Sequence, residues 1–212
     1  ALAFGGYSTT TVGVTEAYNG TAWGELNDLN TGRYGIGGGG TQTSALAFGG
    51  SDDTTVLSVT ESWSGTSWTE VNDLNTARQQ FGSSGTATAA LAFGGEGPPG
   101  KTANTEQWNG TNWSEQNNLP TALSDMSGCG TTTNSLSYGG SPPASVADTN
   151  EWIVGVPIGV WATSTALNTA RQLPRGAGSN ELFDNQPTDI NIGRGYILIE
   201  GNDQPIGGKW SF

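Results

Sequence analysis

Short apolar runs that end in a pair of glycines recur along the chain and set its organisation. The first run is Leu-Ala-Phe-Gly-Gly at residues 2–6, and it returns at residues 46–50, 91–95 and, in a looser form, 136–140. Successive copies are about 45 residues apart, and a constant spacing of this size is typical of repeat proteins. Each run predicts a short strand that ends in a turn, where glycine supplies a positive φ.

Each repeat carries four strand signals. In the second repeat, strands two, three and four and the first strand of the next repeat are expected at residues 46–50, 59–63, 67–71 and 81–86. The dipeptides Asn19-Gly20 and Asn109-Gly110 favour tight hairpin turns between the third and fourth strands. Four strands in about 45 residues are typical of one blade of a β-propeller. The pattern therefore predicts an all-β chain.

The repeats end before the C-terminus, which divides the chain into two parts. Residues 1–180 form the predicted repeat domain, and residues 181–212 carry no further copy of the pattern. Within this tail, residues 195–201 predict one more strand and residues 205–212 an extended end. We expect the tail to act as a cap on the repeats, as a fifth blade or as an assembly contact.

The composition is that of a packed β-protein and argues against several classes of binding and catalytic site. Among 212 residues there are 34 glycines and eight tryptophans, so glycine marks turns while tryptophan fills the core. The net charge is −12 with only seven basic residues, which argues against binding to nucleic acid or to anionic membranes. The absence of histidine and the single Cys129 argue against metal sites and the commonest catalytic triads. We therefore expect no metal, no cofactor and no enzymatic activity.

Four residue types return in a fixed order: an Arg before the first strand, a glycine pair after the second, an aromatic residue, and then a Trp. In the second and third repeats they are Arg33, Gly49-Gly50, Trp63, Trp68, Arg78, Gly94-Gly95, Trp108 and Trp113. With this order the chain resembles the kelch repeat over residues 1–180. The resemblance implies a β-propeller of four four-stranded blades. Five blades, a β-solenoid or an extended fibre are the alternatives.

A second, looser resemblance lies in the short sequence motifs within the repeats. Thr-Glu-x-Trp, Asn-Gly-Thr-x-Trp and Leu-Asn-Thr-Ala-Arg are similar to repeats in proteins of tailed, often marine, bacteriophages. This resemblance implies a location at a virion surface or outside the cell, in a tail fibre, a spike or the capsid surface. It implies no activity.

Charged residues make up only 12% of the chain, yet two of them return with the repeat. A Glu recurs in the third strand and an Arg before the first strand, at Glu16, Glu61, Glu106, Arg33, Arg78 and Arg171. Grouping each Arg with the blade that it opens pairs Arg33 with Glu61 and Arg78 with Glu106. In the fourth copy Leu123 and Asn150 take both positions. Because losing one partner of a buried pair is costly, the joint loss favours a real pairing over coincidence, which is the alternative.

Arg171 and Glu16 are left without partners at opposite ends of the repeats. We therefore expect residues 172–179 to form the first strand of the opening blade and to close a ring, with Arg171 beside Glu16. The first strands of the other blades are rich in small residues, which fit a crowded centre. Cys129 occupies one of these positions and is expected to be a buried filler.

One set of loops differs between copies while the rest of the repeat is nearly constant. These loops join the second and third strands, at residues 7–13, 51–58, 96–103 and 141–148. A constant framework with one variable loop set is typical of a binding surface, although unconstrained drift gives the same pattern. The candidate ligand-binding residues in these loops are Tyr7, Asp52, Asp53, Glu96, Lys101 and Asp148.

Two functions of different class fit this sequence. The first is a non-enzymatic component of a virion that assembles with itself or with other virion proteins and binds host-surface glycans. The second is a kelch-type adaptor that binds a protein partner. Two features favour the first function. The surface is low in charge and rich in Thr, Ser, Gly and Asn, and the repeat motifs resemble those of bacteriophage proteins.

Overall fold

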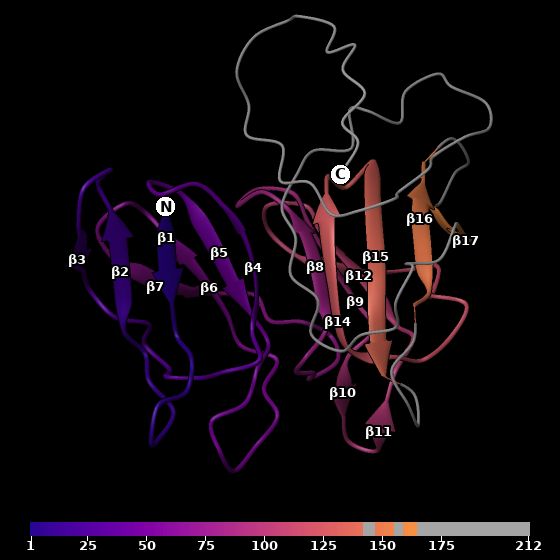
Figure 1. Ribbon diagram of the computed structural model, residues 1–212, viewed down its shortest axis with the longest axis horizontal. Coiled ribbons are helices and arrows are strands. Elements are labelled where there is room, and N and C mark those ends of the chain that lie inside the picture. The colour runs from indigo at the N-terminus through magenta and orange to yellow at the C-terminus, as the bar shows by residue number, and fades with distance from the viewer. Residues whose placement is uncertain (142–146, 155–158, 165–212) are drawn as a thin grey trace, which may run out of the picture.

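The computed structural model describes residues 1–141, 147–154 and 159–164, and every regular element in these ranges is a β-strand (Figure 1). The prediction of an all-β chain is therefore confirmed for this part of the molecule. In the same ranges no helix has the length and hydrophobicity needed to cross a bilayer. The strands are β1 (Leu2–Phe4), β2 (Thr15–Tyr18), β3 (Trp23–Glu25), β4 (Gly37–Gly40), β5 (Ala45–Phe48), β6 (Thr60–Trp63), β7 (Trp68–Val71), β8 (Gly82–Gly85), β9 (Ala90–Phe93), β10 (Glu96–Gly97), β11 (Gly100–Lys101), β12 (Thr105–Trp108), β13 (Trp113–Gln116), β14 (Ser124–Gly130), β15 (Asn134–Ser141), β16 (Thr149–Ile153) and β17 (Val160–Thr163).

The strands form antiparallel sheets in which strands adjacent in the chain also lie side by side. Three sheets have four strands, in the orders β4-β5-β6-β7, β8-β9-β12-β13 and β14-β15-β16-β17. The first sheet has three strands, in the order β1-β2-β3. A short hairpin, β10-β11, extends the loop between β9 and β12 and was not expected from the sequence. Each repeat thus forms one up-and-down sheet.

In the first three sheets the glycine pair follows directly after the apolar strand, as predicted, whereas Gly139 and Gly140 lie inside β15. Gly49 and Gly50 have φ values of 64° and 105°, a region that favours glycine over other residues. A Cβ atom on Gly49 would lie 2.7 Å from the carbonyl oxygen of Arg78, in the segment that leads to the next sheet. The pair is therefore required both by the backbone conformation and by the close approach of the neighbouring segment.

The first strands of the four-stranded sheets, β4, β8 and β14, lie next to one another at the inner edge of the array. The backbone N–H of Gly38 in β4 donates to Oγ of Ser83 in β8 at 3.3 Å, and this hydroxyl is also 3.3 Å from the Gly38 carbonyl oxygen. A Cβ atom on Gly39 would lie 2.9 Å from the carbonyl oxygen of Gly85. Small residues are therefore needed here because the inner strands approach one another at backbone distance.

Aromatic side chains join each sheet to the next. The Phe of each second strand packs against the Trp that begins the fourth strand of the following sheet. The ring centroids are 5.0, 4.8 and 4.8 Å apart in the pairs Phe4–Trp68, Phe48–Trp113 and Phe93–Trp161. Such contacts stabilise by more than their buried area alone. The core thus consists of a repeated contact between sheets.

The same tryptophans also make a repeated hydrogen bond. Each indole Nε1–H donates to the hydroxyl of the Thr that begins the third strand of the preceding sheet. The distances are 2.9, 3.1 and 2.9 Å for Trp68 to Thr15, Trp113 to Thr60 and Trp161 to Thr105. Because these groups are buried, each bond satisfies a donor and an acceptor that would otherwise be costly to bury. We call this combined Phe–Trp–Thr contact the sheet joint.

Within the described residues, the first sheet has no counterpart of the inner strand that the other three sheets have. Ala1 and Gly5 direct their backbone groups at β2, because the Ala1 carbonyl accepts from Tyr18 and the Gly5 N–H donates to Val14, both at 2.9 Å. The alternation of an antiparallel strand therefore directs the backbone groups of Leu2 and Phe4 to the open edge. A groove of about 390 Å³ runs along this edge.

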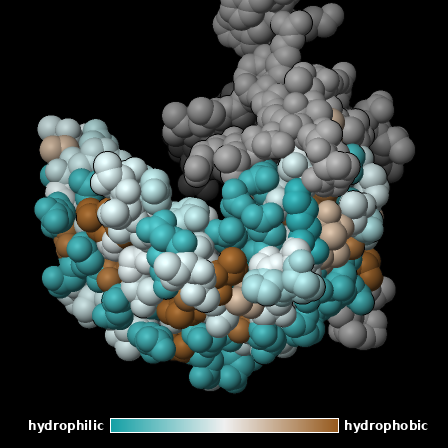
Figure 2. Space-filling view, turned by 90° about the horizontal axis from the view of Figure 1, so that it is seen from below, coloured by the Kyte–Doolittle hydropathy of each residue, from teal (hydrophilic) through white to brown (hydrophobic). Residues whose placement is uncertain are grey.

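The predicted occupant of that edge, residues 172–179, lies outside the described residues, as do Arg171 and the strand expected at residues 195–201. Ring closure therefore stays a prediction. Figure 2 shows the described sheets as an arc that is open on one side, with the first sheet as its free arm at the left.

Replacing Gly39 by Val should destabilise the fold by about 1–3 kcal/mol, because the added side chain must displace the backbone of β8. Val at Gly24, in the outer strand β3, is the matched control, since nothing lies within 4 Å of a Cβ atom there. That change should alter the unfolding free energy by about 0.5 kcal/mol or less. Urea denaturation measures both. Equal effects of the two substitutions would contradict the close approach of the inner strands.

Candidate functional site

The recurring Arg and Glu form buried ion pairs in the second and third repeats. Arg33, which precedes β4, donates from Nη1 to Oε1 of Glu61 in β6, and both side chains are fully buried. Arg33 also donates from Nε to the Gly49 carbonyl oxygen at 2.9 Å and from Nη1 to that of Thr31 at 2.9 Å. The guanidinium therefore binds the carboxylate and two turns of the backbone together.

The carboxylate of Glu61 also binds the segment that connects the first sheet to the second. Its Oε2 accepts from the backbone N–H of Asn30 at 2.8 Å and from Asn30 Nδ2 at 2.9 Å. Its Oε1 accepts from the N–H of Thr31 at 3.3 Å. A buried carboxylate needs several donors, and here they come from the connecting segment and from Arg33. The pair thus fixes the path of the chain between two sheets.

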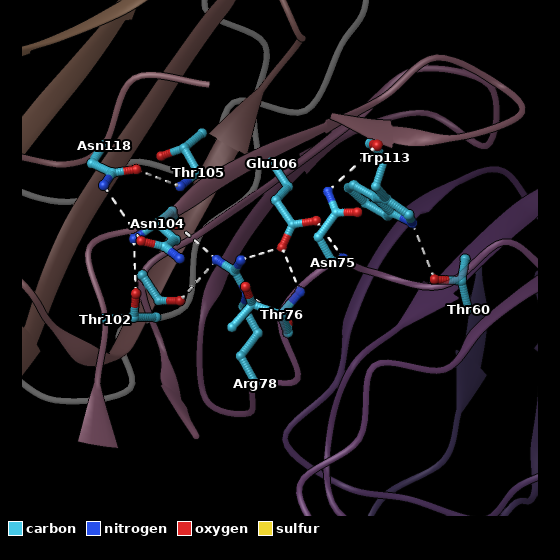
Figure 3. A network of polar contacts seen from close by, with 11 residues as sticks. Thr60, Asn75, Thr76, Arg78, Thr102, Asn104, Thr105, Glu106, Trp113 and Asn118 are labelled. Atoms are coloured by element: carbon cyan, nitrogen blue, oxygen red, sulfur yellow. Dashed lines mark hydrogen bonds and ion pairs between the residues drawn. The ribbon is translucent and has the colours of Figure 1, made fainter. Parts of the chain in front are cut away.

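The third repeat reproduces this network around Glu106 (Figure 3). Arg78 donates from Nη2 to Oε1 of Glu106, with both side chains fully buried. The backbone N–H of Asn75 donates to Oε2 at 2.7 Å and that of Thr76 to Oε1 at 3.2 Å. Nη1 of Arg78 also donates to the Asn104 carbonyl oxygen at 2.7 Å. We call each of these networks a charged clamp.

In the fourth repeat a neutral arrangement replaces the charged clamp. Leu123 is buried, and Asn150 donates from Nδ2 to Oγ of Ser137 in β15 at 3.3 Å. The equivalent carboxylate in the first sheet, Glu16, is exposed, and no ion pair joins it to another described residue. Arg171, its expected partner, lies outside the described ranges.

Burial and neighbouring charge shift the pKa values of two groups near the charged clamp of the third repeat. Desolvation lowers the pKa of Arg78, and the attraction of Glu106 opposes that effect. Glu115 lies opposite Glu106 in the adjacent strand. Burial raises the pKa of Glu115, the negative charge of Glu106 adds to this, and Arg78 opposes it. Arg78 thus offsets the repulsion between two carboxylates on neighbouring strands.

The first three variable loops lie along one edge of the molecule, the edge that carries β10 and β11 in Figure 1. Tyr7 in the first loop is 60% exposed and packs edge to face on Tyr34, with ring centroids 5.5 Å apart. Oδ2 of Asp53 accepts hydrogen bonds from the backbone N–H and the hydroxyl of Thr11. The first two loops are therefore joined to each other.

Asp52 caps its own loop. Its Oδ1 accepts from the hydroxyl of Thr54 at 2.8 Å, and from the N–H groups of Thr54 and Thr55 at 3.1 and 2.8 Å. These bonds, the hydroxyl of Thr54 first, lower the pKa of Asp52. Asp52 and Asp53 thus have structural partners within the loops, and a ligand role for them stays a prediction.

The other three candidates lie in the loops of the third and fourth repeats. Glu96 is half-buried in β10 and accepts from Nε2 of Gln79 at 3.4 Å. Lys101 in β11 donates from Nζ to the Ser141 carbonyl oxygen, which joins the third and fourth loops. Asp148 is exposed. Across the described part of the chain, no three carboxylate or Cys side chains gather as a metal site would require.

The Trp–Thr hydrogen bonds of the sheet joint had no counterpart among the sequence-based predictions. The signal was present, because a Thr precedes the recurring Glu in the first three repeats. The donated amides of Asn30 and Thr31 were also missed, since backbone donors leave no trace in the side-chain pattern. Cys129, expected as a buried filler, is half-buried, and desolvation raises the pKa of its thiol.

Arg78→Leu and Glu106→Asn place in the charged clamp of the third repeat the residue types that the fourth repeat has at Leu123 and Asn150. Each substitution alone should destabilise by about 3–5 kcal/mol, because it leaves a buried charge without its partner. The double variant should cost less than the sum of the two, by about 1–3 kcal/mol, in denaturant unfolding. Glu70→Gln, at an exposed position, is the control and should change little. Additive costs would show that the pair is not coupled.

Comparisons with known proteins assign no function to this chain. The chain matches no model of a known protein family, and no curated protein is similar to it. The kelch and phage resemblances therefore rest on the residues themselves.

Proposed function

We propose that this chain is a non-enzymatic structural and binding module that assembles with itself, as a tail-fibre, spike or capsid-surface component of a virion. The observation that carries the proposal is the use of its scarce charges. Arg33, Arg78 and their carboxylate partners are buried between sheets, and Asp52 and Asp53 cap loops. These charges hold the connecting segments and loops of the framework in place. A surface that is low in charge and rich in hydroxyl and amide groups suits packing against further copies and weak recognition of neutral glycans.

The finer architecture that we propose is a kelch-like propeller with residues 172–179 as the inner strand of the first sheet. The groove beside β1 supports this, because Ala1, Leu2 and Phe4 line it together with Gly38, Gly39 and Gly40 of β4. In the other sheets a small-residue strand fills the equivalent place. Residues 167–171, Leu-Asn-Thr-Ala-Arg, also have the same sequence as residues 74–78, which lead into β8. Arg171 is then the expected partner of Glu16.

The native mass of the full chain tests self-assembly. We expect a stable multimer in native mass spectrometry and in sedimentation, and residues 1–180 measured in parallel show whether residues 181–212 add a contact. A chain that remains a monomer at every concentration would contradict a self-assembling component and favour the alternative, an adaptor that binds a different protein through its variable loops.

The variable-loop edge is the proposed glycan surface. Replacement of residues 51–58 by a Gly-Ser segment of equal length should abolish binding on an array of host-surface glycans at a temperature where the variant is still folded. Its unfolding midpoint should fall, because the bonds of Asp52 and Asp53 are lost. The control is an equal replacement of residues 64–67, the hairpin turn between β6 and β7. An array without signal for the unsubstituted chain would remove the receptor role and leave scaffolding alone.

A further inference from the structure

The outer strand of each of the first three sheets carries a glutamate opposite the glutamate of the third strand. The pairs, in register, are Glu16 with Glu25, Glu61 with Glu70 and Glu106 with Glu115. In the fourth sheet Asn150 lies opposite Thr163, and β17 contains no charged residue. A charge on an edge strand hinders the addition of another strand. Among the outer strands of the described sheets, β17 therefore lacks this protection.

The backbone of β17 has one side directed away from the sheet. The N–H of Ser164 donates to the Thr149 carbonyl oxygen at 2.8 Å. By the alternation of an antiparallel pair, Ala162 also directs its backbone groups at β16, and those of Trp161 and Thr163 point to the outer side. The structure places no strand on that side within the residues that it describes. A further strand can therefore bind there through backbone hydrogen bonds.

Exposed aliphatic side chains lie at the end of β17 where the hairpin turns. Ile153 is paired with Val160, and the exposed fractions of Ile153, Val154 and Val160 are 44%, 45% and 38%. We call these three residues the aliphatic tip. Apolar side chains gathered at an exposed position of a sheet edge are typical of a surface that another segment covers.

The other repeats have polar residues at the same position of the hairpin. The pair that corresponds to Ile153 and Val160 is Asn109 with Asn112 in the third repeat, joined by a backbone hydrogen bond. Ser64 takes the first of these places in the second repeat. Ser64 and Asn109 are exposed although a following sheet packs on each of their sheets. A neighbouring sheet therefore does not cover this position, and closure of the ring would leave the aliphatic tip exposed.

We propose that residues 195–201 of the same chain pair with β17 as an additional outer strand of the fourth sheet and cover the aliphatic tip. This segment, Gly-Tyr-Ile-Leu-Ile-Glu-Gly, contains the longest apolar run in residues 165–212. Its aromatic and β-branched residues favour a strand. Alternate side chains of a strand added at this edge lie on the face that carries Val160. The tail then acts as a cap, which goes beyond the proposed function and does not depend on self-assembly.

The chain is long enough to make this contact. Its described part ends at Ser164, directly after β17. With residues 172–179 as the inner strand of the first sheet, residues 180–194 remain to reach the outer edge of the fourth sheet. A segment of this length spans up to about 50 Å when extended. Four strands side by side are only about 15 Å across. The outer edges of all four sheets are then protected, three by a glutamate and one by the tail.

Hydrogen exchange of the full chain, read by mass spectrometry in peptides that contain residues 195–201, tests the cap. The backbone amides of this segment should exchange about 100-fold or more slowly than those of an unstructured peptide, because a paired strand protects them. Ile153→Asn combined with Val160→Asn gives the tip the residue types of the third repeat and should speed this exchange by about 10-fold or more. Thr163→Glu, which places a charge at the edge, should act in the same direction.

Leu26→Asn is the control, since Leu26 is another exposed aliphatic residue, 38% exposed, beside β3. It should leave exchange in residues 195–201 unchanged. The unfolding midpoints of the variants should stay close to that of the unsubstituted chain, because each substitution is at an exposed position.

Rapid exchange of residues 195–201 in the unsubstituted chain would overturn the proposal. Slow exchange that neither the double variant nor Thr163→Glu changes would overturn it too, because the segment would then be bound elsewhere. The measurement is repeated over a range of concentrations, and the protection should be the same throughout. Protection that is lost on dilution would assign the added strand to a second copy and contradict pairing within one chain.

Discussion

The structure depends on one repeated contact between neighbouring sheets. A fourth-strand Trp packs on an aromatic ring of the preceding sheet and donates a hydrogen bond to its Thr. An isolated sheet of short strands has little core of its own, and here the Trp of one sheet completes the core of its neighbour. Trp68, Trp113 and Trp161 make this contact with the same residue types and nearly the same distances. The regular spacing of the sheets follows from the repetition of one contact.

The charged clamp adds the second constraint, at the segments that connect the sheets. Glu61 and Glu106 each accept from backbone N–H groups of a connecting segment and from an Arg beside it. Burying such a pair adds little net stability, but it specifies one path for the chain. The fourth repeat shows that the path can also be held without charge, by Leu123 and by Asn150 bonded to Ser137.

The repeated features could be predicted from the sequence because repetition separates signal from chance. The strands, the glycine pairs and the pairing of Arg33 with Glu61 all follow from residues that recur at one spacing. The β10-β11 hairpin could not be predicted, since it occurs in one copy. The loop candidates follow from the variation of their loops between copies. The structure shows Asp52 bonded within its own turn and Asp53 bonded to Thr11 of the first loop, and a ligand role for them stays a prediction. Turn bonds of this kind depend on local backbone geometry that the spacing of residues does not reveal.

The same repetition connects the fold to its proposed role. The contact between sheets is directional, and among the described residues Trp23 is exposed in the first sheet while the hydroxyl of Thr149 in the fourth sheet has no hydrogen-bond partner. Hydrogen exchange of the indole N–H groups, followed by NMR, tests the joint most directly. We expect the indole N–H groups of Trp68, Trp113 and Trp161 to exchange only through unfolding of the sheets, because each is buried and donates a hydrogen bond. The indole N–H of Trp23, which is 51% exposed, should exchange faster than these three. Equal, rapid exchange at all four would contradict it.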